Sequence, residues 1–261
     1  MSLNAYFNRI HYTGDTEATI ETLRAIHRAH LMSIPFENLN IHMPKPIILD
    51  EKLLFEKIVT ENRGGFCFEQ NALFYEVLSQ LGYDVQRLEA NVYHEGGDYG
   101  VPMNHMCLLV TIEGVRYLAD VGFGASFIEP LLIDTPDIQE QSVGRFKIGI
   151  DGDTAYYHSQ GIGADKMTIG YRFFFTPHTL ADYETACHYM QTSPKTHFTQ
   201  KRVCSRWSEQ GRITLSDNKF IVTTWEGQRT ETAISDEAHW HQLLEQHFGI
   251  TIQTQPPQAM F

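Results

Sequence analysis

The hydrophobic periodicity of the chain changes near Gly82, and this change limits the fold more than any other feature. Before it, apolar residues recur at helical spacing in three segments, 16–31, 51–62 and 66–81. From Asp84 onward, short segments rich in β-branched and aromatic residues alternate with glycine, Asp or Pro turns. The sequence therefore predicts an α+β fold, in which an N-terminal helical bundle precedes a central antiparallel β-barrel or sandwich.

Local signals give the expected boundaries of the helices. Pro35 follows the first helix, Asp50 can cap the second, and Gly64 and Gly65 are expected to end it. Gly82 ends the third helix. The bundle is thus predicted to end where the strands begin.

The remaining elements divide the chain into three predicted segments. Strands are expected at 85–93, 105–112, 115–123, 145–150, 154–160, 171–176, 211–217 and 219–234. Helices are expected at 182–190 and 235–249, the latter capped by Ser235, and the tail from Thr254 is expected to be irregular. This pattern predicts a helical subdomain (1–83), a β-barrel subdomain (84–190) and a C-terminal α/β lid (191–261).

Composition limits the classes of partner. The formal net charge is −12 and the sequence contains no run of basic residues, so nucleic acid is not an expected partner. No segment has the roughly 18 consecutive apolar residues that a membrane span needs, and the N-terminus lacks a signal peptide, so we expect a cytoplasmic protein. The four cysteines lack metal-binding or disulfide-scaffold spacing, which predicts free thiols and no metal site.

One cysteine has an unusual position. Cys67 lies in the stretch NRGGFCFEQN (62–71), directly after two glycines and in the expected first turn of a helix. Free amides and the helix dipole at such a terminus favour a thiolate and can stabilise an oxyanion. A buried apolar cysteine between Phe66 and Phe68 is the other interpretation, and only a base within reach favours the catalytic one.

The expected register of one hairpin places a histidine and a carboxylate on the same face of the sheet, where the histidine could act as the base. A two-residue turn at Glu113-Gly114 pairs Ile112 with Val115. His105 and Asp120 then become diagonal neighbours on one face, roughly 7–8 Å apart. A carboxylate there can hold an imidazole in one tautomer and stabilise its charged form. A polar pair on a solvated sheet face remains the alternative.

Several stretches, taken in order, resemble the arylamine N-acetyltransferases. These are IPFENLNI (34–41), RGGFCFEQN (63–71), HMCLLV (105–110), LADVGFG (118–124) and TSPKTHF (192–198), which together extend over nearly the whole chain. The resemblance implies a cysteine-protease-like core and a catalytic triad of Cys67, His105 and Asp120. It also implies the contact between Cys67 and His105, which the periodicity of the chain cannot supply.

The activity implied by the resemblance is acetyl transfer in xenobiotic metabolism. Cys67 would take an acetyl group from acetyl-CoA and pass it to an arylamine, arylhydrazine or N-hydroxyarylamine in a ping-pong reaction, without a metal. An amide synthase and a thiol hydrolase would use the same triad and remain alternatives. The partners implied are therefore acetyl-CoA and a small aromatic amine or hydrazine, and a homodimer remains an option.

The resemblance also suggests residues around the triad. Phe36 and Phe123 match aromatic residues that line the acceptor pocket, although core packing would explain them equally well. Gly122 and Gly124 resemble the glycine loop beside the pantetheine arm of the coenzyme, where the family often continues with a glycine and this chain has Ala125.

Charged residues complete the expected site. Glu37 and Arg63 are predicted to form a buried charge pair that supports the catalytic loop. No basic cluster suggests a site for the phosphates of CoA, and Lys195, Lys201 and Arg202 are the candidates that the sequence offers.

Overall fold

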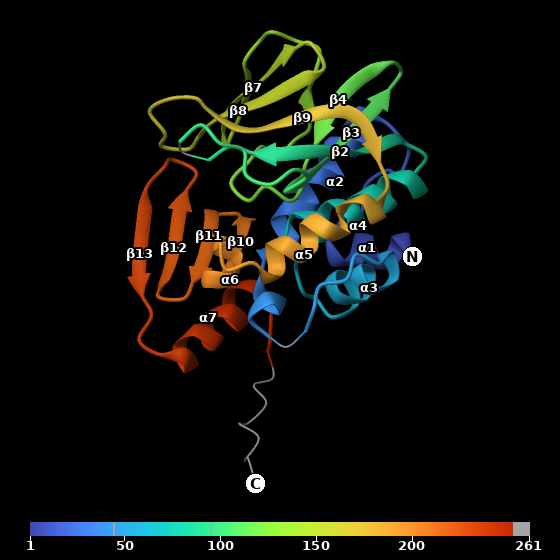
Figure 1. The fold of residues 1–261 in the computed structure, drawn as a ribbon. Coiled ribbons are helices and arrows are strands. Elements are labelled where there is room, and N and C mark those ends of the chain that lie inside the picture. The colour runs from blue at the N-terminus through green and yellow to red at the C-terminus, as the bar shows by residue number, and fades with distance from the viewer. Residues whose placement is uncertain (44, 95, 253–261) are drawn as a thin grey trace.

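A computed structural model describes residues 1–43, 45–94 and 96–252. The expected irregular tail from Thr254 lies outside the described residues. Figure 1 shows the N-terminal helices beneath a large curved sheet, with a smaller sheet beside the helices. The α+β class predicted from the sequence is confirmed.

The helices form where the apolar spacing indicated, with shifted ends. They are α1 (Leu3–Arg9), α2 (Ile20–Ser33), α3 (Glu51–Phe55) with a π-helical turn after it (Glu56–Thr60), α4 (Cys67–Gln80), α5 (Glu184–Thr192), α6 (His197–Gln200) and α7 (Glu237–Phe248). Short 3₁₀ turns lie at Leu39–His42 and Leu180–Tyr183. The sequence analysis missed α1, whose seven residues are too few for a clear periodic signal.

Three helix caps test the predicted boundaries. Asp50 caps α3 by accepting from the backbone N–H groups of Lys52 and Leu53, as expected. Thr19, four residues into the predicted helix, caps α2 instead of allowing it to begin at 16. The predicted cap Ser235 is wrong, because Asp236 accepts from the N–H of His239 and caps α7, which begins at Glu237.

Within the described residues, eight antiparallel strands form the large sheet. In spatial order they are β5 (Leu131–Leu132), β4 (Val115–Ala119), β3 (His105–Ile112), β2 (Asp84–Val92), β9 (Thr168–His178), β8 (Thr154–Gly161), β7 (Gly144–Asp151) and β6 (Gln139–Gln141). The β3–β4 hairpin pairs Ile112 with Val115, so the predicted two-residue turn and register are confirmed. The strand expected to reach Phe123 ends at Ala119, which leaves Asp120 in the loop directly after it.

The two edges of this sheet meet through side chains. The amide of Gln139 on β6 accepts from the N–H of Leu132 at 2.7 Å and donates to its carbonyl at 2.8 Å. Gln141 does the same with the chain before β5, accepting from Ile128 and Glu129 and donating to the carbonyl of Glu129. Two glutamine side chains therefore replace a backbone ladder and nearly close the sheet into a barrel.

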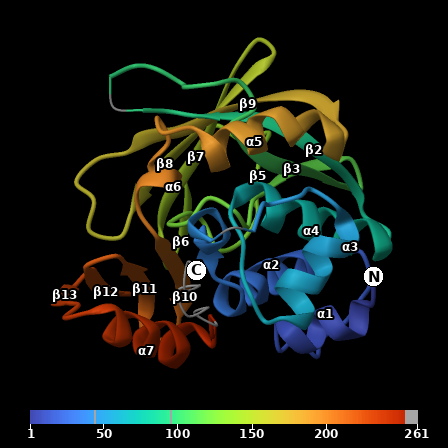
Figure 2. The same cartoon turned by 60° about the horizontal axis from the view of Figure 1, so that its bottom comes forward.

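In the part of the chain that the structure describes, the smaller sheet has five antiparallel strands and two different faces. Its order is β1 (Phe36–Glu37), β10 (Val203–Ser208), β11 (Gly211–Ser216), β12 (Lys219–Thr224) and β13 (Arg229–Ala233). Figure 2 shows α7 along one face, where Trp240, Leu244 and Phe248 pack against apolar residues of the sheet. Because β1 comes from the N-terminal part, this sheet joins the first and third predicted segments, and the division into three subdomains stays a prediction.

The main core lies between the helices and the large sheet. Apolar residues of α2 and α4, such as Ile26 and Phe74, share one buried cluster with strand residues such as Leu108 and Phe146. A separate cluster surrounds Cys67 at the beginning of α4. Among the described residues, no helix has the length and apolar character required to cross a membrane.

Candidate active site

Cys67 is the first residue of α4 and is almost fully buried. Its side chain is 4% exposed, and Sγ lies 4.0 Å from the backbone carbonyl of Asn104, the residue before His105. Glu69, in the same first turn, accepts from the N–H of Phe66 at 3.1 Å and so fixes the residue before Cys67. The predicted position at a helix N-terminus is confirmed, and the structure brings the cysteine to the strand that carries the histidine.

The loop before Cys67 uses its glycines for close packing rather than for left-handed turns. A Cβ at Gly64 would lie 1.9 Å from the backbone oxygen of Pro35, so no larger residue fits. The left-handed residue in this loop is Asn62, with φ of 55°. The expectation that the two glycines end the preceding helix is therefore wrong, since that helix ends at Thr60.

A network of buried charged side chains includes Arg63 of this loop and Glu69 of the helix that follows it. Arg63 donates to the Glu37 carboxylate at 2.7 Å and to Asn40 at 2.9 Å, which confirms the predicted Glu37–Arg63 pair. Lys57 from the π-helical turn extends the network, with its Nζ 2.7 Å from Glu69 and 3.7 Å from Glu37. The sequence analysis did not identify Lys57.

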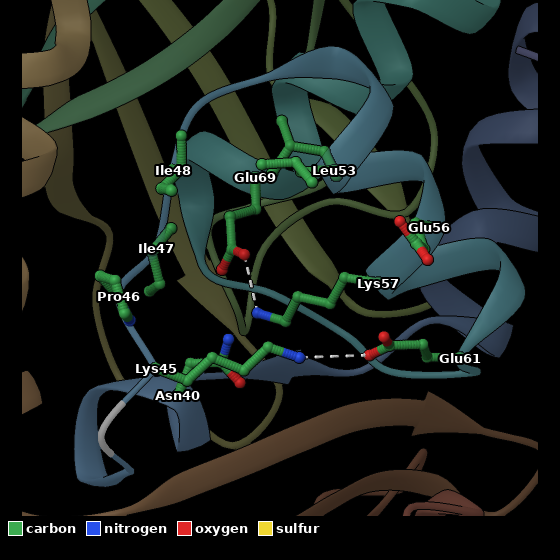
Figure 3. Close-up of a pocket in the computed structure, with 11 residues that line it drawn as sticks. Asn40, Lys45, Pro46, Ile47, Ile48, Leu53, Glu56, Lys57, Glu61 and Glu69 are labelled. Carbon is green, nitrogen blue, oxygen red and sulfur yellow. Dashed lines mark hydrogen bonds and ion pairs between the residues drawn. The ribbon is translucent and has the colours of Figure 1, made fainter.

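Lys57 and Glu69 line a cavity of about 320 Å³, together with residues of α3 and of the segment around Ile47. Figure 3 shows these two side chains pointing toward each other at the cavity. A second pair, Lys45 with Glu61 at 3.7 Å, lies at the same cavity with both side chains exposed. The cavity thus has one buried ion pair, beside the loop before Cys67, and one solvated ion pair.

His105 and Asp120 meet as the hairpin parity predicted. His105 Nε2 lies 2.7 Å from Asp120 Oδ2, and both side chains are buried. The ladder stops before these residues, so the contact is made by a strand residue and a loop residue rather than by two paired strands. The interpretation as a solvated polar pair is wrong, because neither group reaches solvent.

Asp120 is held by several donors. Asn71 Nδ2 donates to Oδ1 at 2.9 Å, and the N–H of Gly122 donates to the same oxygen at 2.9 Å. Burial alone would raise the pKa of Asp120, but the neighbouring His105 and these hydrogen bonds outweigh it and lower the pKa. The carboxylate is therefore ionised at neutral pH and fixes the orientation of the imidazole.

Asn71 could have been found from the sequence. It lies four residues after Cys67 on α4, a spacing that places two side chains on the same face of a helix. Its amide also donates to the carbonyl of Met106 at 2.7 Å and accepts from the N–H of Val121 at 3.0 Å. One side chain therefore connects the helix that begins at Cys67 to β3 and to the loop that follows β4.

The titration of Cys67 differs from the sequence-based expectation. Burial raises the pKa of the Cys67 thiol well above its ordinary value, and the negative charge of Asp120 raises it further. A hydrogen bond from the N–H of Phe68 lowers the pKa, but this is a smaller effect. The helix terminus alone therefore does not produce a thiolate, and a cation beside the sulfur is required.

Cys67 and His105 line one pocket of about 210 Å³. All the other predicted site residues except Asp120 line it too, namely Phe36, Phe123, Gly122 and Gly124, together with Ala125. The ring centroid of Phe123 lies 5.2 Å from that of His105. The roles of these residues toward an acceptor or a coenzyme stay predictions.

Gly122 also has a packing role. A Cβ there would lie 2.7 Å from Cys67 Cα and 2.8 Å from the side-chain amide of Asn71. The glycine therefore lets the loop after Asp120 approach the first turn of α4, which is sufficient to explain its identity.

Other lining residues were not predicted as site residues, among them Met190, Phe198, Ser205 and Arg212, although Phe198 ends the TSPKTHF stretch (192–198) that contributes to the resemblance. They come from α5, α6, β10 and β11, far along the chain from Cys67. Of the basic residues suggested for coenzyme phosphates, Arg202 is paired with both Asp217 and Glu237 and is thus held in the small sheet.

The remaining cysteines and His27 have structural explanations. Cys107, Cys187 and Cys204 are buried free thiols, as predicted, and Cys187 shares the cluster around Cys67. His27 is buried, bridges the Ile128 carbonyl and the N–H of Asp120, and has its pKa lowered by burial to about 4. Among the described residues, no group of three or more His, Cys, Asp or Glu side chains is arranged to hold a metal ion.

Comparison with known proteins gives consistent matches over nearly the full length. An N-acetyltransferase family model matches residues 19–256. The arylamine N-acetyltransferase of Escherichia coli K12 is 32% identical over 257 residues, covering 96% of this chain and 89% of that protein.

Two solved structures have the same fold. The arylamine N-acetyltransferase of Salmonella typhimurium superposes with a TM-score of 0.91 at 30% identity, covering 99% of this chain and 94% of that one. That of Mycobacterium marinum in complex with CoA gives 0.88 at 30% identity, covering 95% and 93%. On the family match and on identity and coverage alike, the chain belongs to the arylamine N-acetyltransferase family.

Proposed function

We propose that this enzyme transfers an acetyl group from acetyl-CoA to arylamines, arylhydrazines or N-hydroxyarylamines through an acetyl-Cys67 intermediate. The observation that carries the proposal is the position of His105. Its Nε2 is bound to the ionised Asp120, while Nδ1 is the nitrogen left for the thiol that lines the same pocket. The complex of the Mycobacterium marinum relative with CoA supports CoA as the acetyl carrier.

In the acyl step, His105 takes the proton of the Cys67 thiol and becomes a cation held by Asp120. The sulfur then attacks the thioester carbonyl carbon, and the amides of the first turn of α4, which have no acceptor within the helix, can stabilise the oxyanion. The bond between that carbon and the CoA sulfur breaks, and His105 returns the proton to CoA. Acetyl-Cys67 remains.

In the acceptor step, the amine nitrogen attacks the acetyl carbon of acetyl-Cys67. His105 accepts the proton that the amine loses, and the bond from carbon to Sγ breaks. The same proton neutralises the released thiolate, so the enzyme returns to its initial state. Burial of Cys67 is consistent with this scheme, because a thiolate raised in energy by burial forms only beside the imidazolium.

The decisive measurement is the intact mass of the protein after incubation with acetyl-CoA alone. We expect one acetyl adduct that is absent in Cys67→Ser and that disappears when an arylamine such as aniline is added. The absence of an adduct at any pH would refute the proposal. An adduct discharged by water as rapidly as by amines would indicate a thiol hydrolase, and one discharged only by an amine tethered to its own acyl chain would indicate an amide synthase.

The coupling of Cys67 to His105 has its own test. We expect iodoacetamide to label Cys67 in the wild type well below pH 8.5, the ordinary pKa of a thiol, because the ion pair supplies the thiolate. In His105→Ala the labelling should move above that pH, since burial then acts without a neighbouring cation. Identical pH profiles for the two proteins would contradict the proposed activation.

A further inference from the structure

The pocket that holds Cys67 also holds a cation without a carboxylate partner. Arg212 on β11 points from the face of the small sheet opposite to α7, and its Nε donates to Ser205 Oγ at 3.0 Å. Ser205 is itself fixed by Thr214 Oγ1 at 2.9 Å. Among the described residues, no Asp or Glu pairs with the guanidinium of Arg212, whereas the nearby Arg229 is neutralised by Glu231.

The rest of the described pocket lining also lacks a negative charge that could compensate Arg212. The chain carries a net charge of −12, yet the described lining of the pocket contains no carboxylate. Its imidazole and guanidinium groups belong to His94, His105, His197 and Arg212. Burial and the charge of Arg229 lower the pKa of Arg212 to about 10, so it remains a cation at neutral pH. A half-buried charge that no protein anion compensates is costly, and an anionic ligand would remove that cost.

Two glycines set an upper limit on the distance between the guanidinium of Arg212 and Cys67. Gly122 packs against Cys67, and Gly124, two residues on, has its Cβ position 3.6 Å from Arg212 Nη2. Two residues extend the chain by at most about 7 Å. The guanidinium therefore lies within the reach of a substituent on an aromatic ring whose amine is at Cys67, and the pocket of about 210 Å³ fits one such ring.

We propose that Arg212, oriented by Ser205, binds an anionic substituent of the acceptor, so that the preferred substrates are aromatic amines that carry a carboxylate, such as aminobenzoates. The inference rests on the proposed acetyl transfer. The short distance favours the acceptor over the CoA phosphates, since the long pantetheine arm separates those phosphates from the reacting thioester.

The test compares two acceptors of the same shape, 4-aminobenzoate and its neutral analogue 4-aminobenzamide. A hydrogen-bonded charge pair in a partly desolvated site changes affinity by about tenfold to a hundredfold. We expect Arg212→Met to lower the ratio of kcat/KM for 4-aminobenzoate over 4-aminobenzamide by that factor. Arg212→Lys should keep part of the preference, because it keeps the charge but loses the planar fork.

Arg229→Met is the matched control, since it removes an arginine from the same sheet that is not part of the pocket lining. It should leave the acceptor ratio within about twofold of wild type, in line with its solvated, ion-paired position. Thermal unfolding of each variant separates a folding defect from a change in selectivity. An unchanged ratio in Arg212→Met would overturn the inference, as would an equal loss for both acceptors.

Two further readouts separate this inference from the proposed function. If Arg212→Met slows formation of acetyl-Cys67 from acetyl-CoA and leaves the acceptor ratio intact, the cation binds CoA phosphates and the inference is wrong. Protection of Cys67 from iodoacetamide by 4-aminobenzoate needs no acetyl transfer. Protection in the wild type that is lost in Arg212→Met would support the anion site even without an acetyl adduct, and equal protection of both proteins would refute it.

Discussion

Replacing Lys57 by Met tests whether the buried charge network holds the loop before Cys67. The lysine is 2.7 Å from Glu69 and 3.7 Å from Glu37, and all three side chains are at least nine-tenths buried. Lys57→Met keeps the volume of the side chain and leaves the Glu69 carboxylate without its cation. Arg63 still neutralises Glu37, so the effect is expected to fall mainly on Glu69.

The magnitude follows from the burial of the partners. Removing one member of a buried ion pair costs about 3–5 kcal/mol, because the other charge is left in a poorly solvated site. For a chain of this size each kcal/mol lowers Tm by about 2–4 °C, so we expect Tm to fall by about 6–20 °C. The double variant Lys57→Met with Glu69→Gln should regain at least about 1 kcal/mol, because the amide oxygen of Gln can still accept from Phe66.

Lys45→Met is the control at the same cavity (Figure 3). Its partner Glu61 is 3.7 Å away and both side chains are exposed, so the loss should stay below about 1 kcal/mol. Urea unfolding of the four proteins measures these differences. A free energy of unfolding for Lys57→Met as close to wild type as that of Lys45→Met would refute the reasoning, and so would a double variant no more stable than the single one.

The destabilisation should also depend on pH. Burial already raises the pKa of Glu69, against the opposing charge of Lys57, and removing the lysine raises it further. A carboxyl whose pKa is higher in the folded than in the unfolded state stabilises the fold when protonated, and this contribution is lost as the pH rises. The deficit of Lys57→Met relative to wild type should therefore grow from pH 5 to pH 8.

Three further predictions concern the triad. Asn71→Ala removes a donor from Asp120 and should lower kcat/KM about 10- to 100-fold, with slower release of CoA in the first turnover as the measurement. Gly122→Ala forces a Cβ to 2.7 Å from the Cα of Cys67 and should cost about 1–3 kcal/mol in urea unfolding, whereas Gly161→Ala, with open space around it, should change stability by less than about 0.5 kcal/mol. The pKa of Asp120 is lowered in the folded state, so its contribution is present above about pH 4, the unfolded value, and is lost as the pH falls through the folded pKa. Asp120→Asn should accordingly be less stable than wild type at pH 7, with the gap narrowing in acid, and a constant gap would count against this assignment.

Local patterns predicted the parts of the fold that local physics determines. The apolar period gave α2 and α4, and the two-residue turn gave the register that brings His105 to Asp120. The alternation of side chains along a strand constrains the register strongly, because a shift of one residue would move every side chain of the strand to the other face of the sheet. The hairpin was thus predictable even though the strand ended at Ala119, earlier than expected.

Long-range packing determined what the sequence could not predict. The pKa of Cys67 was expected to be low from its helix terminus, but burial by segments such as α5 has the larger effect. Arg212 gave no sequence signal, because a lone arginine in an amphipathic strand is usually a solvated residue. Only the assembled sheet shows that its side chain enters the pocket of Cys67.

The barrel has one seam, between β6 and the segment that includes β5, where side chains of two glutamines make the hydrogen bonds. The neighbouring strands of the sheet are joined by backbone ladders instead. Elsewhere the strands separate only if several backbone hydrogen bonds break together, whereas here the amide groups of Gln139 and Gln141 carry the contact. Replacing these two glutamines should therefore open this seam without removing a hydrogen bond of any backbone ladder. Gln139 also occupies the N–H and the carbonyl of Leu132 on the two-residue edge strand β5, groups that would otherwise offer a template for pairing with another molecule.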